Sequence, residues 1–272
     1  MTNRILSLAA LTTLDVPPPE QVRIAAQTGY THVGLRLMPA TPTDPDYDML
    51  GDTEMLRDTL AALRETGIGV SDVEIIRLMP EFRLDDRIRL FFDTARRLGA
   101  TQVLVAGNDP DAPRAADNLA RLAEAGRGFG LTMNLEPMPW TSVRNLAQAQ
   151  ALIHTSGRDD VGILVDAFHF WRAGETLESL AGLPASALNY MQLCDAPAQA
   201  PESEEALIAQ ARGARMVPGE GGLDLHGLMR ALPAGLPVSV EVPLGGELGK
   251  LPALARARRL SDAARSYLHS VR

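Results

Sequence analysis

The sequence of 272 residues predicts an α/β fold, a single (β/α)8 TIM barrel that forms one domain over residues 1–272. Three observations lead to this prediction. There are eight short apolar runs, a segment of helical pattern separates each run from the next, and several of these segments end in glycine just before a run, as in QTGYTHV, ETGIGV and RLGATQV. Strands that alternate with helices at this spacing form parallel sheets with right-handed crossovers, and eight such units close a barrel.

The first four units occupy the first 130 residues. An apolar run at 5–12 predicts the first strand. The helix after it begins at three prolines and stops near Gly29, because proline suits the first turn of a helix and glycine suits its end. The next units are predicted as strands 31–37, 68–78 and 101–107 and helices 53–67, 85–99 and 112–130.

The last four units follow the same pattern. Strands are predicted at 131–137, 161–167, 188–195 and 237–243, with helices near 143–155, 174–182, 203–213 and 251–268. No glycine-rich loop joins a strand to a following helix, so the dinucleotide-binding fingerprint of a doubly wound sheet is absent from the sequence. No linker, charge run or low-complexity segment divides the chain.

The composition excludes two classes of partner. A net charge of −8 argues against a nucleic-acid surface, which needs a basic patch. No apolar window approaches the ~18 residues of a membrane span. The early apolar run lacks a small-residue cleavage site and is interpreted as a strand rather than a signal peptide, and the lone Cys194 fits a reducing compartment. We therefore expect a cytoplasmic protein, and the sequence leaves open a homo-oligomer.

Acidic residues follow the apolar runs at four strand ends: Glu136, Asp166, Asp195 (with Gln192 before it) and Glu241. The carboxyl ends of all strands in a parallel barrel meet at one rim, so these side chains should converge there. Carboxylate oxygens hold hard divalent cations, and an oxygen-rich set suits Mg²⁺ or Mn²⁺ better than Zn²⁺. The alternative for each acid is that it caps the next helix or pairs with an arginine.

Aromatic residues and a histidine lie beside these acids. His169 follows Asp166 by three residues, which suggests a substrate hydrogen bond, although a lone histidine is more often structural. Trp140 and Trp171 come just after candidate ligands, and an apolar wall beside polar groups suits the C–H face and hydroxyls of a sugar. Phe168 and Phe170 are weaker candidates of the same kind, since core packing also explains them.

Two further polar residues are candidates for substrate binding. Arg215, before a Pro-Gly turn, could hold an anionic or hydroxyl-rich substrate. Glu74 ends the third strand and could point into the same cavity, or it could form a salt bridge with Arg77 or Arg36. Asp195 also belongs to the substrate-binding candidates.

The order of these motifs resembles the xylose isomerase-like barrel superfamily, in its sugar phosphate isomerase/epimerase branch: a strand-five glutamate, D-A-F-H, Q-L-C-D, R-M-V-P-G-E-G and a strand-eight glutamate. The resemblance spans nearly the whole chain. It implies a divalent metal, often Mn²⁺ or Mg²⁺, and a substrate held by His169 and Arg215. By motif position, the metal ligands that it implies are Glu136, Asp166, Gln192 and Glu241.

The resemblance also implies a reaction. In the ketose epimerases, two metal-bound glutamates exchange the proton beside the substrate carbonyl, and Glu136 and Glu241 hold these catalytic positions here. The sequence departs from that pattern at Gln192, where the epimerases have a histidine, although an amide oxygen still ligates Mg²⁺ or Mn²⁺. Asp195 is available to make up for a weaker ligand.

Three hypotheses for function follow from these residues. The first is a metal-dependent isomerase or epimerase of a small sugar or keto-sugar, acting through an enediolate. The second is a dehydratase or lyase that acts on a polyhydroxylated keto compound. The third is a non-catalytic sugar-binding module or partner subunit.

Overall fold

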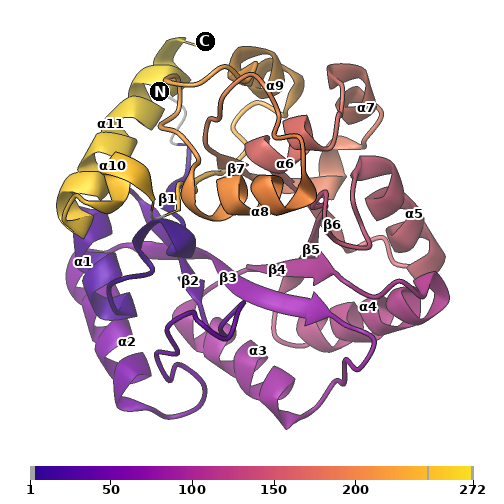
Figure 1. Ribbon diagram of the computed structural model, residues 1–272. Coiled ribbons are helices and arrows are strands. Elements are labelled where there is room, and N and C mark those ends of the chain that lie inside the picture. Colours follow the sequence, from indigo (N-terminus) through magenta and orange to yellow (C-terminus); the bar gives the residue numbers. More distant parts are fainter. Residues whose placement is uncertain (1–3, 244, 271–272) are drawn as a thin grey trace.

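The computed structural model describes residues 4–243 and 245–270, and it confirms the predicted barrel. Eight parallel strands pair in chain order, and β1 closes the ring against β8 with Ser7 opposite Ser239. Helices surround the strands as an outer layer (Figure 1). The strands are β1 Leu6–Leu8, β2 His32–Arg36, β3 Gly69–Leu78, β4 Gln102–Gly107, β5 Thr132–Glu136, β6 Gly162–Asp166, β7 Leu188–Leu193 and β8 Val238–Val240.

The helices begin and end at residues with clear capping roles. The side chains of Thr53, Asp85 and Asn145 accept hydrogen bonds from the first turns of α2, α3 and α5, while Gly67 and Gly99 end α2 and α3 in the left-handed conformation. The helices are α1 Pro18–Gln27, α2 Glu54–Thr66, α3 Asp86–Leu98, α4 Ala112–Arg127, α5 Leu146–Ser156, α6 Ala167–Arg172, α7 Leu177–Ala181, α8 Glu204–Gly213, α9 Leu225–Ala231, α10 Gly246–Gly249 and α11 Ala253–Ser270.

The predicted first strand is too long. Only Leu6–Leu8 pairs in the sheet, and Ala10–Thr13 forms a 3-10 helix, labelled η1. The Thr12 hydroxyl contacts the end of β8 just after β1 ends, because it donates to the Val240 carbonyl at 2.9 Å and accepts the Val242 N–H at 2.9 Å. The Val240 carbonyl also accepts the Ala9 N–H at 3.2 Å, so the Thr12 side chain continues the contact between these two segments after the backbone ladder ends.

The predicted helices in the second half also need correction at their ends. Residues 174–182 contain only the five-residue α7, and the segment predicted at 143–155 becomes helical only at Leu146. The short helices α6 and α10 were not predicted, because four to six residues carry too little of a 3.6-residue period to be recognised. A second 3-10 turn, Ala185–Ala187, precedes β7.

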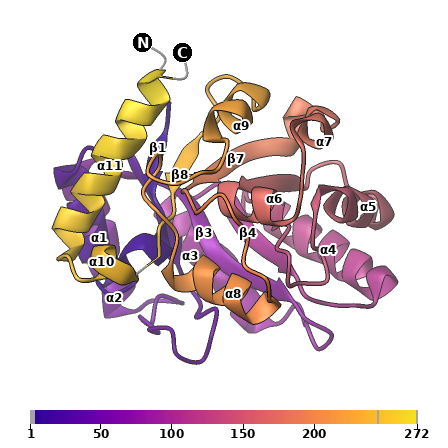
Figure 2. The ribbon, with the colours of Figure 1, turned by 45° about the horizontal axis from the view of Figure 1, so that its top comes forward.

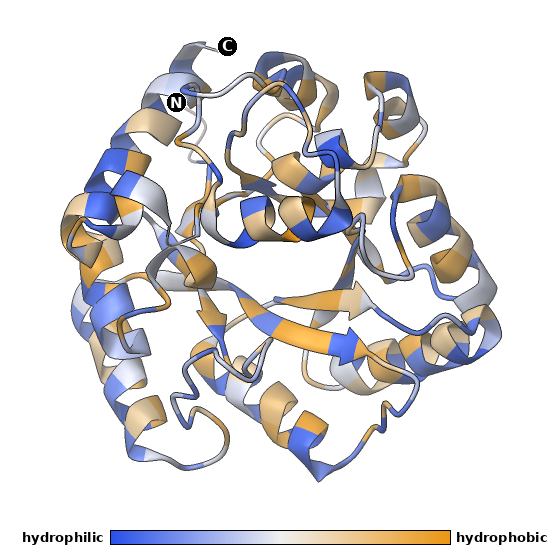
Figure 3. Ribbon diagram, in the orientation of Figure 1, coloured by the Kyte–Doolittle hydropathy of each residue, from blue (hydrophilic) through white to orange (hydrophobic). Residues whose placement is uncertain are grey.

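Apolar side chains fill two separate layers. The larger core lies between the strands and the outer helices, whose outward faces are hydrophilic in Figure 3. A small cluster of mainly inward-facing strand residues lies apart from it and includes Leu104, Ala106, Leu164 and Tyr190. These residues fill the interior of the barrel below its carboxyl-end rim, as expected for a closed ring of eight strands.

Helices α11 and α8 occupy different positions relative to the strands. The C-terminal helix α11 packs against α1, and both lie on the same side of the barrel in Figures 1 and 2. Helix α8 lies over the strands rather than in the outer layer in both views, and its last turn lines a cavity at the rim. Among the helices of the described residues, none has the length and apolar character that a membrane crossing requires.

Candidate active site

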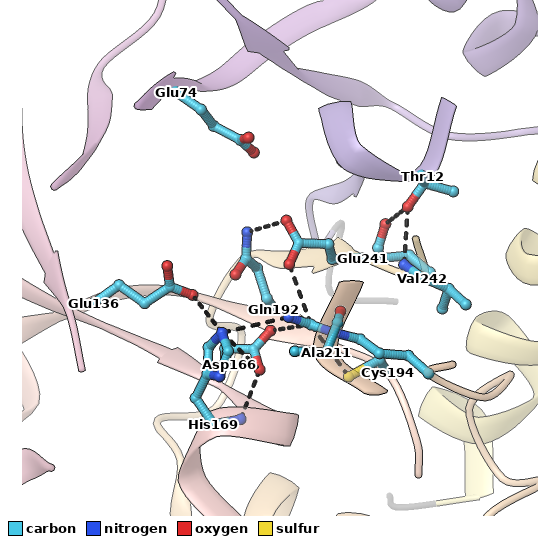
Figure 4. Close-up of polar contacts among 12 residues, drawn as sticks. Thr12, Glu74, Glu136, Asp166, His169, Gln192, Cys194, Ala211, Glu241 and Val242 are labelled. Atoms are coloured by element: carbon cyan, nitrogen blue, oxygen red, sulfur yellow. Dashed lines mark hydrogen bonds and ion pairs between the residues drawn. The ribbon is translucent and has the colours of Figure 1, made fainter. Parts of the chain in front are cut away.

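Four polar side chains converge at the carboxyl-end rim of the barrel. Glu136 is the last residue of β5, Asp166 is the last residue of β6, Gln192 lies in β7 and Glu241 directly follows β8. All four are buried, and Figure 4 shows them pointing toward one another. The closed ring therefore brings together carboxylates that are more than a hundred positions apart in the sequence.

His169 is held against two of these acids. Its backbone N–H donates to Asp166 Oδ1 at 2.8 Å, so Asp166 also caps α6. The ring Nε2 lies 3.7 Å from Glu136 Oε1, and the ring packs edge-on against Trp140 and Phe168 with centroids 5.0 Å and 5.5 Å away. Glu136, Asp166 and His169 each offer a ligand atom, and these atoms lie within 4.8 Å of one another.

Arg215 pairs with two of the acids. Its Nη1 lies 2.6 Å from Asp166 Oδ2 and 3.1 Å from Glu241 Oε2, and its Nε donates to the Ala211 carbonyl at 2.9 Å. The guanidinium also lies over the Phe168 ring at 5.1 Å. An arginine therefore balances part of the buried negative charge, which was the alternative considered for the strand-end acids.

Gln192 is fixed by Glu241. Its Nε2 donates to Glu241 Oε1 at 2.9 Å, which leaves the amide Oε1 buried without a hydrogen-bond partner among the described residues. Glu136 Oε1 is buried and lacks a hydrogen bond in the same way. Unpaired buried oxygens are costly, and their presence indicates a group that is to be bound.

The pKa values of the site differ because the partners differ. Burial raises the pKa of Glu136 well above its ordinary value, and repulsion from Asp166 and Glu241 adds to this. Burial also raises the pKa of Glu241, to about 8, although Arg215 opposes it. Burial alone would raise the pKa of Asp166, but the shorter contact with Arg215 and the His169 N–H lower it overall.

His169 is neutral at pH 7. Burial lowers its pKa to about 4, although Asp166 opposes the effect. Arg215 Nη2 lies 3.4 Å from His169 Nε2, and because arginine can only donate, Nε2 is the acceptor and the proton lies on Nδ1. The site thus holds one neutral imidazole beside a protonatable glutamate.

A cavity of about 460 Å³ opens beside these residues. Glu74 lies in its wall and is bound by Arg36 Nη2 at 2.7 Å, while Arg36 Nη1 contacts Asp44 Oδ2 of the rim loop at 3.0 Å. This is the alternative salt bridge considered for Glu74. The predicted residues in the lining are Glu74, Glu136, Trp140, His169, Arg215 and Glu241.

Two predicted substrate-binding residues lie elsewhere. The Asp195 carboxylate accepts backbone N–H groups of Gly219, Gly221 and Leu223 at 3.0–3.1 Å, so it organises the loop after β7 and is not among the residues that line the cavity. Trp171 is partly buried against the apolar core and does not line the cavity either.

Sequence reasoning did not propose five charged cavity residues as site residues. Arg36 is the last residue of β2, and Arg77 comes just before the end of β3. Asp15 lies between η1 and α1, Asp44 lies in the rim loop, and Arg212 lies in the last turn of α8. The strand-end rule that selected the acids would also have selected Arg36 and Arg77 if it had been applied to cations.

The donor set suits a divalent cation. Glu136, Asp166 and Glu241 supply carboxylates, and Gln192 presents a buried amide oxygen without a partner. Hard divalent ions prefer such oxygens, and an imidazole such as His169 widens the choice to softer ions. A buried cluster of this charge, only partly balanced by Arg215, is stabilised by a further cation.

Relatives with assigned activities are similar to this chain over part of their length. The chain is 30% identical over 166 residues to the 3-dehydroshikimate dehydratase of Pseudomonas aeruginosa, which covers 58% of this chain and 26% of that protein. It is 29% identical over 119 residues to the inosose isomerase of Bacillus subtilis. This match covers 43% of this chain and 40% of that protein. The matched region is less than half the length of each relative.

Solved structures share the fold. The IolI protein with a bound zinc atom superposes with a TM-score of 0.80 at 21% identity, covering 98% of this chain and 99% of that one. The probable 3-dehydroshikimate dehydratase AsbF of Bacillus anthracis gives a TM-score of 0.76 at 12% identity, covering 96% and 98%. The profile of the family described as "Xylose isomerase-like TIM barrel" matches residues 22–266. This chain therefore belongs to the xylose isomerase-like TIM barrel family.

Proposed function

We propose that this protein is a divalent-metal-dependent enzyme that removes a proton beside the carbonyl group of a small polyhydroxylated compound. The observation that carries the proposal is Glu136. Its Oε1 is buried beside the cavity and has no hydrogen-bond partner among the described residues. A carboxylate oxygen that no donor occupies can accept a proton, which suits the abstraction of a C–H proton from a substrate in this cavity.

The ion would be held by Glu136, Asp166, Gln192 and Glu241, and we propose Mg²⁺ or Mn²⁺ because this set is rich in oxygen. When bound, it supplies Lewis-acid stabilisation of the charge that develops on the substrate carbonyl oxygen. Side chains of the protein bind and orient the substrate. Among the residues that line the cavity, His169 contacts a substrate hydroxyl and the face of Trp140 packs against the C–H side of the substrate.

The geometry favours dehydration over epimerisation. Epimerisation needs two bases on opposite faces of one carbon, and Glu241 is the second candidate. However, Glu241 Oε1 accepts from Gln192 and Oε2 pairs with Arg215, whereas Glu136 retains a free oxygen. One free base is enough for dehydration: Glu136 takes the proton, the electron pair of the C–H bond forms the C=C bond, and the protonated Glu136 returns the proton to the departing hydroxyl, which leaves as water.

Isomerisation is the second candidate, and it shares the first step. The similarity to both a dehydratase and inosose isomerases supports the shared step rather than one outcome. The Mn²⁺-loaded enzyme should therefore be incubated in D₂O with 3-dehydroshikimate, inososes and keto-sugars. Product mass separates the outcomes, because dehydration removes one water, while isomerisation retains all heavy atoms and raises the mass only by the deuterium taken up from the solvent.

Variants then assign the base. Glu136→Gln should lower turnover about 1000-fold or more, since a glutamine cannot accept the proton. Glu81→Gln, at an exposed glutamate, is the matched control and should retain activity. Retained turnover in Glu136→Gln with intact metal binding would contradict the role of Glu136.

A further inference from the structure

Four arginines line the cavity, and their charges are balanced differently. Arg36 pairs with Glu74 and Asp44, and Arg215 pairs with Asp166 and Glu241. The other two, Arg77 and Arg212, form no ion pair within residues 4–243 and 245–270. Among the described residues, the cavity lining also holds five acidic residues, yet none of them forms an ion pair with Arg77 or Arg212, so these two guanidinium groups are available to an anionic group of a ligand.

Arg77 points into the barrel rim. It lies opposite Ala106 in the register of β3 and β4, and Ala106 belongs to the inward-facing cluster. Its Nη1 donates to Asn108 Oδ1 at 3.2 Å, while its Nε is buried and has no hydrogen-bond partner among the described residues. The buried Nε–H of this half-buried arginine requires an acceptor that the described residues do not supply.

Arg212 reaches the same space from α8. It is exposed, it lines the cavity, and its charge is the largest electrostatic influence on Arg77 after burial. Both effects lower the pKa of Arg77. Two like charges facing one cavity repel each other, and an anion between them removes the repulsion.

The surroundings fit a carboxylate better than a phosphate. Barrel enzymes commonly bind phosphate with backbone N–H groups of the loops after strands seven and eight and with a helix N-terminus. Here the N–H groups of Gly219, Gly221 and Leu223 in the loop after β7 already donate to Asp195. Helix α8 presents its C-terminal turn to the cavity, so the free N–H groups of its first turn, which a phosphate would use, do not face this space.

We infer that Arg77 and Arg212 form a subsite for a carboxylate group of the substrate, so that the substrate is a polyhydroxylated keto acid rather than a neutral sugar. The inference rests on the proposed function, because it places the carboxylate in the cavity that contains Glu136. A planar carboxylate matches the planar N–H fork of arginine, and the partial burial of Arg77 strengthens the contact.

The test compares acids with neutral amides of the same shape. Binding of quinate and quinamide, and of gluconate and gluconamide, is measured by calorimetry on the Mn²⁺-loaded protein. Each acid should bind at least about 10-fold more tightly than its amide. Arg77→Gln should abolish this difference and Arg212→Gln should reduce it, with the Arg212 contribution falling further at high salt because that side chain is exposed. Arg87→Gln, at an exposed arginine on α3, should change nothing.

Several results would overturn the carboxylate subsite. These are equal binding of acid and amide, no saturable binding of either acid, a preference that survives in correctly folded Arg77→Gln, or tighter Arg77-dependent binding of glycerol phosphate than of either acid. Circular dichroism checks that the variants fold. These measurements need no turnover, so they can succeed when the Glu136 experiment fails, and the reverse also holds.

Discussion

Gln192 Nε2 donates to Glu241 Oε1 at 2.9 Å, and this contact sets which atom of the amide is available for binding. Because the nitrogen is engaged, the oxygen is the free end, and it is buried without a partner among the described residues. A carbonyl oxygen at this position is a hard ligand, whereas the histidine of the epimerase pattern offers a nitrogen.

The first prediction concerns metal preference. Gln192→His should raise the affinity for Zn²⁺ by about 10-fold relative to Mn²⁺ and Mg²⁺, because imidazole favours the softer ion. Calorimetric titration of the metal-free protein with each ion measures this ratio. Gln192→Ala is the control and should weaken the binding of all three ions. An unchanged ratio in Gln192→His would show that residue 192 is not a ligand.

The second prediction concerns Arg215. Arg215→Met leaves the buried Asp166 and Glu241 without their shared guanidinium, so the free energy of unfolding in chelator should fall by about 3–5 kcal/mol. Mn²⁺ should restore part of this loss, and the gain should exceed the gain in the unmodified protein. Urea unfolding with EDTA and with MnCl₂ measures both effects.

Arg215→Lys separates charge from geometry in the same experiment. A lysine keeps the positive charge but cannot reproduce the planar fork, so its stability should lie between those of the unmodified protein and Arg215→Met. Equal stabilisation by Mn²⁺ in all three proteins would show that metal binding and the Arg215 ion pairs are independent.

The third prediction concerns Asp195, whose carboxylate gathers the N–H groups of Gly219, Gly221 and Leu223. Asp195→Asn places an amide NH₂ against these donors, so the free energy of unfolding should fall by about 3 kcal/mol. Limited proteolysis should then cut first in the loop 218–223. A raised KM with unchanged stability and proteolysis would instead indicate the substrate contact that the sequence suggested.

The sequence predicted the barrel and the position of the acids because both follow from the regular alternation of strands and helices along the chain. Alternating strands and helices fix the ring, and a residue at the end of each parallel strand must lie at one rim. Glu136, Asp166 and Glu241 each follow this rule. The resemblance to the epimerases likewise identified Gln192 as the residue that departs from their pattern. In the structure, the amide of Gln192 donates a hydrogen bond to Glu241.

Loop contacts could not be predicted in the same way. Asp195 lies at a strand end like the other acids, but the glycine-rich loop 218–223 folds back over it and occupies its oxygens. Arg215 reaches its two acids from a segment after α8. No regular hydrophobic pattern in the sequence predicts that this segment lies at the rim. These contacts depend on the path of the chain between elements, which hydrophobic patterning does not encode.

The fourth prediction uses a buried acid inside the barrel. Asp72 in β3 is fully buried, its Oδ2 has no hydrogen-bond partner among the described residues, and its pKa is raised to about 7, first by burial and then by Glu74. The unfolded chain has an ordinary carboxyl pKa near 4. Between about pH 4 and pH 7 the folded state therefore holds a proton that the unfolded state has released, so Asp72 lowers the free energy of unfolding as pH rises through this window.

Asp72→Asn removes this titration. The variant should match the unmodified protein near pH 4 and exceed its free energy of unfolding at pH 8 by a few kcal/mol, at most about 4 kcal/mol for a shift of this size. Urea unfolding of both proteins from pH 4 to pH 8.5 gives the difference, and the other buried acids cancel in it because they are present in both. A difference that does not grow between pH 4 and pH 7 would mean that Asp72 is ionised in the folded barrel, which requires a cationic or hydrogen-bonding partner near its Oδ2.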